Sequence, residues 1–362
     1  MAVRNAGGSR FDSWSKGLCG LLVAFTVGLV VLGLSERPAP VVDASSMHIA
    51  VGRTDNALYR ATIERMQNGD NYYRAASAEQ ARRGYPVRPV MTVREPTLSY
   101  AAVAVGGVAH LRYVLIVLGI AAALCLLVTT EGIATGRPSW WLSMVAASTA
   151  LAAAFSPKMV VIHEVWAMLF MIISLVLTLH GRPRTSAAFG LLAVLVRELA
   201  FPFVAVMLVL AWREKRRRDI RAWAVVVGVF VVAYAAHAVM VLALTEPGSV
   251  KSPGWAAFGG WPFVLETIRS SCALLAMPVA VTAVAVPLAL LGWVSKPGVI
   301  ADRVLLVLAI YLPLFMVIGQ PWNSYWGLLY TALLLPGLAY APFAAVSLWK
   351  RLREPAKEIV FT

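Results

Sequence analysis

The sequence predicts an all-helical integral membrane protein, a multi-span bundle with eight full spans and one broken or re-entrant helix pair. Hydrophobic residues make up 60% of the 362 positions and charged residues only 14%. The mean hydropathy of +0.74 is also outside the range of ordinary soluble domains. Basic residues flank the apolar runs. Residues 1–362 are therefore expected to form a single membrane domain, with any chemistry on its spans and loops.

Eight apolar runs reach or approach the length of ~20 residues with which a helix crosses a bilayer. The first follows a basic amino terminus, as in a signal peptide, but no small-residue cleavage site comes after it, so we expect an uncleaved span. The predicted spans are residues 17–34, 111–130, 139–155, 159–179, 222–244, 272–294, 304–319 and 325–349.

Lys and Arg indicate the orientation of these spans, because cytoplasmic loops are enriched in them. They gather in both chain ends and in the short connections 182–184, 213–221 and 296–303. The tails 1–16 and 350–362 are therefore predicted to be cytoplasmic, with the chain in the plasma (inner) membrane. The net charge of +14 is attributed to this topology and to membrane lipids as partners, with no nucleic acid.

The apolar segment 185–212 does not fit a simple span count. It lies between two basic connections, is too short for two complete spans, and carries Arg197, Glu198 and Pro202 at its middle. Two short helices that turn back within the membrane around a cavity would satisfy these constraints. The alternative is one tilted helix in which Arg197 extends to the membrane surface.

The long polar segment 35–98 is predicted to lie outside the cytoplasm. Asp55 can cap a helix that ends near Gly69, and a second helix over 72–83 stops at Gly84 before a proline-rich, extended return to the membrane. The first helix is amphipathic and suited to the membrane surface. Its apolar face comprises Tyr59, Ile63 and Met66.

Common motifs of soluble enzymes are missing from the sequence. It has no phosphate-loop motif and no G-x-S-x-G, and His163-Glu164 lacks the second His of a zinc-protease helix. Cys19, Cys125 and Cys272 all lie in apolar runs, so neither a disulfide framework nor a metal cluster is predicted.

Two pieces of the outer segment resemble a known family. Residues 55–70 read DNALYRATIERMQNGD and residues 93–100 read VREPTLSY. About 50 residues here resemble the opening loop of the protein O-mannosyltransferase and lipid A aminoarabinose transferase group, within the C superfamily (GT-C) of glycosyltransferases. Asn56 replaces the family's second acidic residue, and Glu95 the first Pro of its return motif. The matching positions are Asp55, Tyr59, Met66, Gly69, Asp70, Arg94, Pro96 and Leu98.

The resemblance implies an enzyme that moves a sugar, with inversion, from a polyprenyl-phosphate donor to an extracytoplasmic glycan, lipid or protein. The active site would lie in the periplasmic loop 35–98, and we expect no cofactor. A divalent metal is not supported, because Asn56 cannot supply the second carboxylate.

Asp55 is the candidate general base, because an acceptor hydroxyl is a poor nucleophile and a nearby carboxylate can take its proton. The alternative is that Asp55 only caps its helix, and Asp43 is a weaker candidate base. Tyr59, from the family pattern, and Glu164, at the outer start of a span, are predicted to contact the acceptor or sugar. Glu164 could instead be an ordinary interfacial residue.

The leaving phosphate needs positive partners. Arg94 is the first candidate, with a plain surface arginine as the alternative, and Arg197 is the second, because a charge at membrane depth usually faces a cavity or a partner. A polar, aromatic turn before the last span either belongs to an interfacial belt or binds sugar. Its candidate residues are Gln320, Trp322, Asn323 and Tyr325.

Two other function classes fit part of the sequence. A transporter or flippase of a lipid-linked envelope intermediate would also use a broken helix with a charge at membrane depth, although the two related halves expected of many transporters are not visible. A non-catalytic membrane scaffold subunit would leave the residues of the outer loop dispensable.

Overall fold

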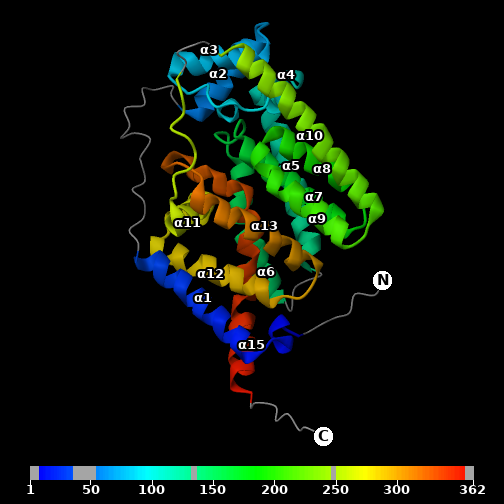
Figure 1. Ribbon diagram of the computed structural model, residues 1–362, viewed down its shortest axis with the longest axis vertical. Helices are drawn as coiled ribbons and strands as arrows, with labels where there is room; N and C mark the ends of the chain where they lie inside the picture. Colours follow the sequence, from blue (N-terminus) through cyan, green and yellow to red (C-terminus); the bar gives the residue numbers. More distant parts are fainter. Residues whose placement is uncertain (1–7, 36–53, 132–136, 246–249, 355–362) are drawn as a thin grey trace.

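The computed structural model describes residues 8–35, 54–131, 137–245 and 250–354, and the side chains of 128–140 are not described. The described chain is helical, with two isolated backbone bridges, so the all-helical prediction is confirmed for these residues. Figure 1 shows an elongated molecule with α2 and α3 at one end and α15 at the other.

Each predicted span corresponds to helical structure, but the count of eight full spans is not confirmed. Five helical segments are long and apolar enough to cross a membrane, while α6, α7, α8 and α12 are shorter apolar helices. The helices over the predicted spans are α1 (Lys16–Ser35), α5 (Val108–Glu131), α6 (Arg137–Leu151), α7 (His163–Leu179), α10 (Arg217–Ala243), α12 (Val279–Ser295), α13 (Val299–Val317) and α15 (Ala341–Arg353).

The last predicted span, 325–349, is not one regular helix. It begins within η6 (Pro321–Leu329) and continues through α14 (Thr331–Leu334), η7 (Leu335–Tyr340) and α15. Close packing against α12 accounts for the irregular part: a Cβ at Gly337 would lie 2.1 Å from the Ala289 carbonyl oxygen, and one at Gly292 would lie 1.9 Å from the Gly337 oxygen. Backbone contact between η7 and α12 thus replaces side-chain packing here.

The segment 185–212 is broken as predicted. α8 (Pro183–Val196) ends at Arg197, whose backbone is extended, with φ −148° and ψ 110°. The chain then forms η4 (Glu198–Ala200) and α9 (Phe201–Arg213), and α8 and α9 both pack against α10. Pro202 lies in the first turn of α9, where backbone N–H groups have no partner within the helix, so the N–H that proline lacks is not missed. The alternative of one tilted helix is therefore wrong.

The outer segment contains α2 (Asp55–Gln67), α3 (Tyr72–Arg83) and α4 (Thr97–Ala104). The bounds of α3 are those predicted, with Gly84 in the left-handed conformation at φ 69°. Two expectations for α2 are wrong. Its N-cap is Thr54, not Asp55. Of the predicted apolar face, Ile63 and Met66 are buried within the protein and Tyr59 is half-buried, so this face packs against the rest of the chain.

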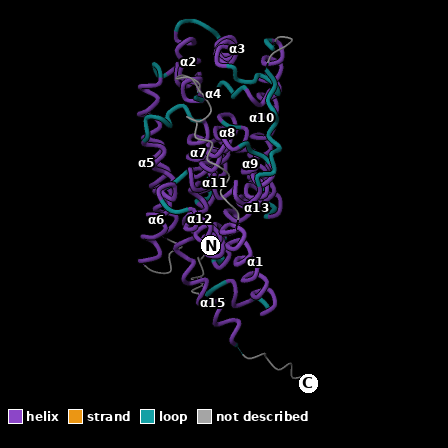
Figure 2. The backbone as a smooth tube through the Cα atoms, turned by 90° about the vertical axis from the view of Figure 1, so that its left-hand side faces the viewer, coloured by secondary structure: helices purple, strands orange, loops and turns teal. Residues whose placement is uncertain are grey.

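The basic segments predicted to be cytoplasmic lie together at one end of the molecule. Arg10 forms an ion pair of 2.8 Å with Asp302, and Arg303 forms one of 3.0 Å with Glu214. At the same end, Arg351 Nε donates to the carbonyl of Trp14 at 2.9 Å. Figures 1 and 2 both place α2 and α3 at the opposite end. The described structure therefore separates the basic connections from the outer segment.

Three polar segments far apart in the sequence meet beside α2 and α3. The return segment pairs with the loop before α11 (Gly260–Ser270), where the amide of Ser252 donates to the Arg88 carbonyl at 2.8 Å. That loop reaches the turn after α13, where the amide of Gly319 donates to the Trp255 carbonyl at 2.7 Å. These three segments are thus hydrogen-bonded to one another on the same side of the bundle.

Helix α7 is at the centre of the bundle, and 14 of its 17 residues are buried. By contrast, α1, α5 and α10 expose many apolar side chains, as lipid-facing helices do. Because α7 starts with His163 and Glu164, its central position brings these two polar side chains into the interior beneath the outer segments.

Candidate functional site

Asp55, Tyr59, Arg94 and Tyr325 form one hydrogen-bonded group, which we call the polar cluster. The Tyr325 hydroxyl donates to Asp55 Oδ2 at 2.8 Å. Arg94 donates from Nη2 to the Tyr325 hydroxyl at 3.3 Å and from Nε to the Tyr59 hydroxyl at 3.0 Å. The cluster joins α2, the return segment and η6, and so brings together residues up to 270 positions apart in the sequence.

Asp55 is available for chemistry because another residue caps its helix. The Thr54 hydroxyl accepts from the amide of Ala57 at 3.2 Å, which leaves the half-buried Asp55 carboxylate to accept from side chains. Burial and the adjacent Asp55 carboxylate raise the pKa of Tyr85, so this second phenol remains a neutral hydrogen-bond donor to Asp55. The Asp55 side chain is thus held by the hydroxyls of Tyr325 and Tyr85.

Arg94 is a buried cation without a carboxylate partner among the described residues. Arg94 is 8% exposed, and its side chain donates hydrogen bonds to the hydroxyls of Tyr59 and Tyr325 and to the Met91 carbonyl. The Tyr72 hydroxyl fixes its backbone by donating to the Arg94 carbonyl. Burying a charge without a paired ion is costly. The nearby carboxylates of Glu164 and Glu198 offset part of that cost, and a bound anion would offset more of it.

Arg197, by contrast, is already compensated. This residue is 0% exposed, its Nε donates to Glu164 Oε1 at 2.6 Å, and its Nη1 pairs with the Glu198 carboxylate. Its guanidinium also lies 5.5 Å from the ring centroid of Trp326. The ion pair with Glu164 holds the helix break against α7, and the pair with Glu198 lies within the break. The phosphate role predicted for Arg197, and the acceptor role predicted for Glu164, stay predictions.

The Arg197 network adjoins the polar cluster through two contacts. The rings of Tyr59 and His163 meet edge to face at 4.8 Å between centroids. On the other side, burial and the nearby negative charge of Glu198 raise the pKa of Glu95, which follows Arg94 in the chain, well above its usual value. The raised pKa favours the protonated form of Glu95, which can donate a hydrogen bond to Glu198.

In the turn 320–325, some side chains stabilise the turn itself and one belongs to the polar cluster. Gln320 Nε2 donates to the Gly254 carbonyl at 2.8 Å, and the Gln320 amide donates to Asn323 Oδ1 at 3.0 Å, so both amide side chains hold the turn in shape. Trp322 is 51% exposed. Only Tyr325 of this turn is hydrogen-bonded within the cluster. Sugar contacts by the other three residues stay predictions.

Sequence reasoning did not place His163, Glu95 and Trp326 at the site. For Glu95 the sequence held a partial indication, because this residue departs from the return motif of the family that the segment resembles. Trp326 is one of several buried tryptophans, and nothing in the sequence distinguishes it from the others. The side chain of Asn56, at the family's second acidic position, donates to the Lys158 carbonyl and accepts from Arg60 Nε at 2.7 Å. Asp43 lies outside the described residues.

Comparisons of the chain with models of known protein families, with curated protein sequences and with solved structures found no match.

Proposed function

We propose that this protein is an inverting glycosyltransferase of the GT-C type that moves a sugar from a polyprenyl-phosphate donor to an extracytoplasmic glycan, lipid or protein. The observation that carries the proposal is the Tyr325 hydroxyl, which contacts a half-buried carboxylate, Asp55, and a buried guanidinium, Arg94, that forms no direct ion pair in the described part of the chain. A candidate base and a candidate anion site are therefore separated by a single hydroxyl group.

The proposed reaction is a single displacement at the anomeric carbon. The acceptor hydroxyl attacks this carbon from the face opposite the phosphate, and Asp55 takes the hydroxyl proton as the new glycosidic bond forms. The bond between the anomeric carbon and the phosphate oxygen breaks at the same time. The polyprenyl phosphate leaves with the bonding electrons, and Arg94 stabilises the negative charge that develops on it.

The arrangement of the bundle supports an extracytoplasmic site. The polar cluster lies with α2, away from the end where Arg10, Arg303 and Arg351 gather. Under the positive-inside rule the basic end is cytoplasmic, which puts both chain ends in the cytoplasm and the cluster outside. A polyprenyl chain could then remain among the lipid-facing helices while its phosphate reaches Arg94.

A transporter of a lipid-linked intermediate is the second candidate, and one observation favours it. The fully buried Arg197, paired with Glu164 and Glu198 at a helix break, has the character of a charge network in a transport path. The two functions predict different products. A transferase releases free polyprenyl phosphate and a glycosylated acceptor, whereas a transporter leaves the lipid-linked sugar intact on the other side of the membrane.

The test is transfer of labelled sugar from polyprenyl-phosphate sugars to cell-envelope material by protein in lipid nanodiscs. Asp55→Asn keeps the size and hydrogen-bonding ability of the side chain but cannot take a proton, so transfer should be lost while expression and thermal stability remain. Asp302→Asn is the matched control, because Asp302 pairs with Arg10 at 2.8 Å at the basic end of the molecule and is outside the cluster.

The control variant should retain transfer near the parent rate. Turnover by the Asp55 variant within about tenfold of the parent would remove the proposed base. An intact lipid-linked sugar in every reaction would favour the transporter or the scaffold.

A further inference from the structure

Buried polar atoms without hydrogen-bond partners are concentrated beside the polar cluster. The described part of the chain has 13 such side-chain nitrogen or oxygen atoms, and six of them belong to four residues. These are both carboxyl oxygens of Glu95, both ring nitrogens of His163, Nη2 of Arg197 and Nε1 of Trp326. The four residues are between 0% and 5% exposed.

The four residues are neighbours in space, although they come from four parts of the chain. Arg197 lies over the Trp326 ring at 5.5 Å and binds Glu164, the residue after His163. The His163 ring contacts Tyr59 of the polar cluster, and Glu95 directly follows Arg94. Their unpartnered atoms therefore occupy the region between the polar cluster and the helix break.

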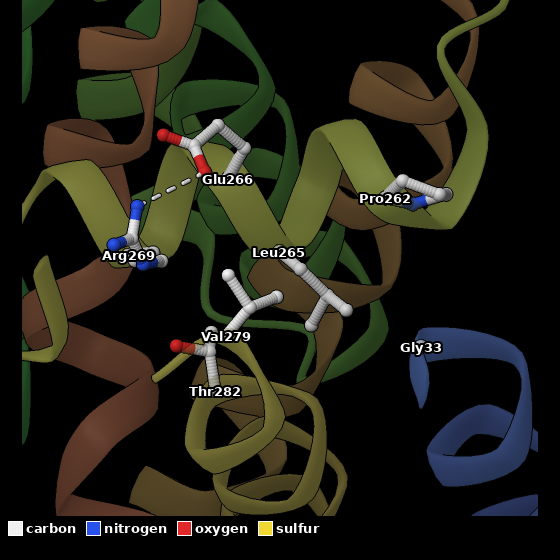
Figure 3. A pocket seen from close by; sticks show the side chains of 7 residues that line it. All are labelled: Gly33, Pro262, Leu265, Glu266, Arg269, Val279 and Thr282. Atoms are coloured by element: carbon white, nitrogen blue, oxygen red, sulfur yellow. Dashed lines mark ion pairs between the residues drawn. The ribbon is translucent and has the colours of Figure 1, made fainter. Parts of the chain in front are cut away.

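Two of the four residues have contacts within the protein, since a protonated Glu95 can bond to Glu198 and His163 interacts with the Val161 backbone, but Arg197 Nη2 and Trp326 Nε1 have no hydrogen-bond partner. Unpartnered polar groups in a protein interior each cost about 1–3 kcal/mol, so their concentration here indicates a site that a polar ligand completes. The pocket in Figure 3 is a weaker candidate. It lies between α1, α11 and α12, and its two charged side chains, Glu266 and Arg269, pair with each other at 3.5 Å. Its charges are thus already compensated within the protein.

The chemistry of the six atoms favours a ligand that both donates and accepts hydrogen bonds. Arg197 Nη2 and Trp326 Nε1 can only donate, while a neutral carboxyl group and an imidazole each donate and accept. Sugar hydroxyls have this double character. Arg197, the one cation among the four residues, is already paired with the carboxylates of Glu164 and Glu198, so it has no unpaired positive charge to offer an anionic sugar.

We propose that Glu95, His163, Arg197 and Trp326 bind the hydroxyl groups of an electrically neutral sugar, which is the sugar transferred. The proposal rests on the glycosyltransferase function and deepens it by assigning the substrate class. It places the sugar on the inner side of the polar cluster, with its phosphate at Arg94 and its anomeric carbon on the side of Asp55.

The test compares the binding of farnesyl phosphate with that of its glucose, mannose, galactose and glucuronic acid derivatives, using the full chain in nanodiscs. Trp326→Phe and His163→Phe remove the unpartnered nitrogens but keep aromatic rings. Both variants should retain or gain thermal stability, because they delete unsatisfied polar groups. Each should weaken binding of the preferred neutral sugar derivative by roughly threefold to tenfold and leave farnesyl phosphate binding unchanged.

Trp293→Phe is the matched control, because Trp293 Nε1 already donates to the Leu333 and Leu334 carbonyls at 3.0 Å. This change should lower thermal stability and leave the affinity for every ligand unchanged. If no neutral sugar binds more tightly than farnesyl phosphate, or if both Phe variants bind all derivatives like the parent, the sugar subsite is refuted. If the glucuronic acid derivative binds best, the assignment to neutral sugars is refuted.

A different set of results would refute the proposed function. Farnesyl phosphate would then bind neither the parent nor any variant, or would bind Arg94→Gln as tightly as the parent. Since the sugar subsite rests on that function, this result would overturn both proposals. Phosphate binding that depends on Arg94 without any contribution from the sugar would overturn the subsite alone.

Discussion

Two buried arginines lie near one another in this protein, and the structure predicts opposite consequences of removing them. Arg197 is paired with Glu164 and Glu198, so Arg197→Met would leave two buried carboxylates without their cation. Breaking a buried ion pair by removing one partner typically costs about 3–5 kcal/mol, so we expect a loss of folding free energy of at least this size. That loss changes the folded-to-unfolded ratio by more than about a hundredfold.

Arg94→Met should hardly change stability. It removes hydrogen bonds to Tyr59 and Tyr325 but also removes a buried charge that has no ion-pair partner among the described residues. The two effects oppose each other, and we expect a net change of less than about 1.5 kcal/mol. Binding of a polyprenyl phosphate should weaken by roughly 2–4 kcal/mol, with partial rescue in Arg94→Lys, which keeps the charge but loses the planar fork.

The change in folding free energy is measured by unfolding in denaturant, followed by tryptophan fluorescence in detergent. The change in affinity for polyprenyl phosphate is measured by ligand binding in nanodiscs. Arg197→Met combined with Glu164→Gln and Glu198→Gln is the control, because it removes the stranded charges and should recover most of the lost stability. Equal destabilisation by Arg94→Met and Arg197→Met would refute the reasoning, since Arg94 would then also be compensated within the fold.

Two further predictions concern the outer segment. The first uses a variant without the three native cysteines. Ala81→Cys, on the exposed face of α3, should react with an impermeant thiol reagent in intact cells, whereas Arg218→Cys, at the basic end, should react only after the membrane is broken. The reverse pattern would mean that the topology is inverted. Because the pKa of Glu95 is raised in the folded state, its protonated form is favoured by folding, and stability should fall as the pH rises from about 5 through that raised pKa, by at most about 1.4 kcal/mol per pH unit. Glu95→Gln should flatten this part of the stability profile, and an unchanged slope would mean that Glu95 does not titrate there.

Local patterns in the sequence were sufficient for several of the helices, although not for the irregular segment 325–349. Apolar runs predicted the positions of α1, α5 and α10, and Gly84 predicted the end of α3, because only a residue free to adopt positive φ ends a helix in this way at little cost. The break at Arg197 was also predicted, since a charge within an apolar run and a proline five residues later cannot continue one lipid-exposed helix. These properties depend on neighbours within a few positions.

Partners across the bundle depended on the tertiary structure. The sequence left two roles open for Asp55, which could cap its helix or take a proton. In the fold, Thr54 caps the helix, and Asp55 accepts a hydrogen bond from the Tyr325 hydroxyl. It likewise paired Arg197 with Glu164 and left Arg94 without a carboxylate in the described chain. The reason is physical: a side chain's charge and hydrogen-bonding ability are set by its own atoms, but its compensation depends on groups up to 270 residues away that packing brings within 3 Å.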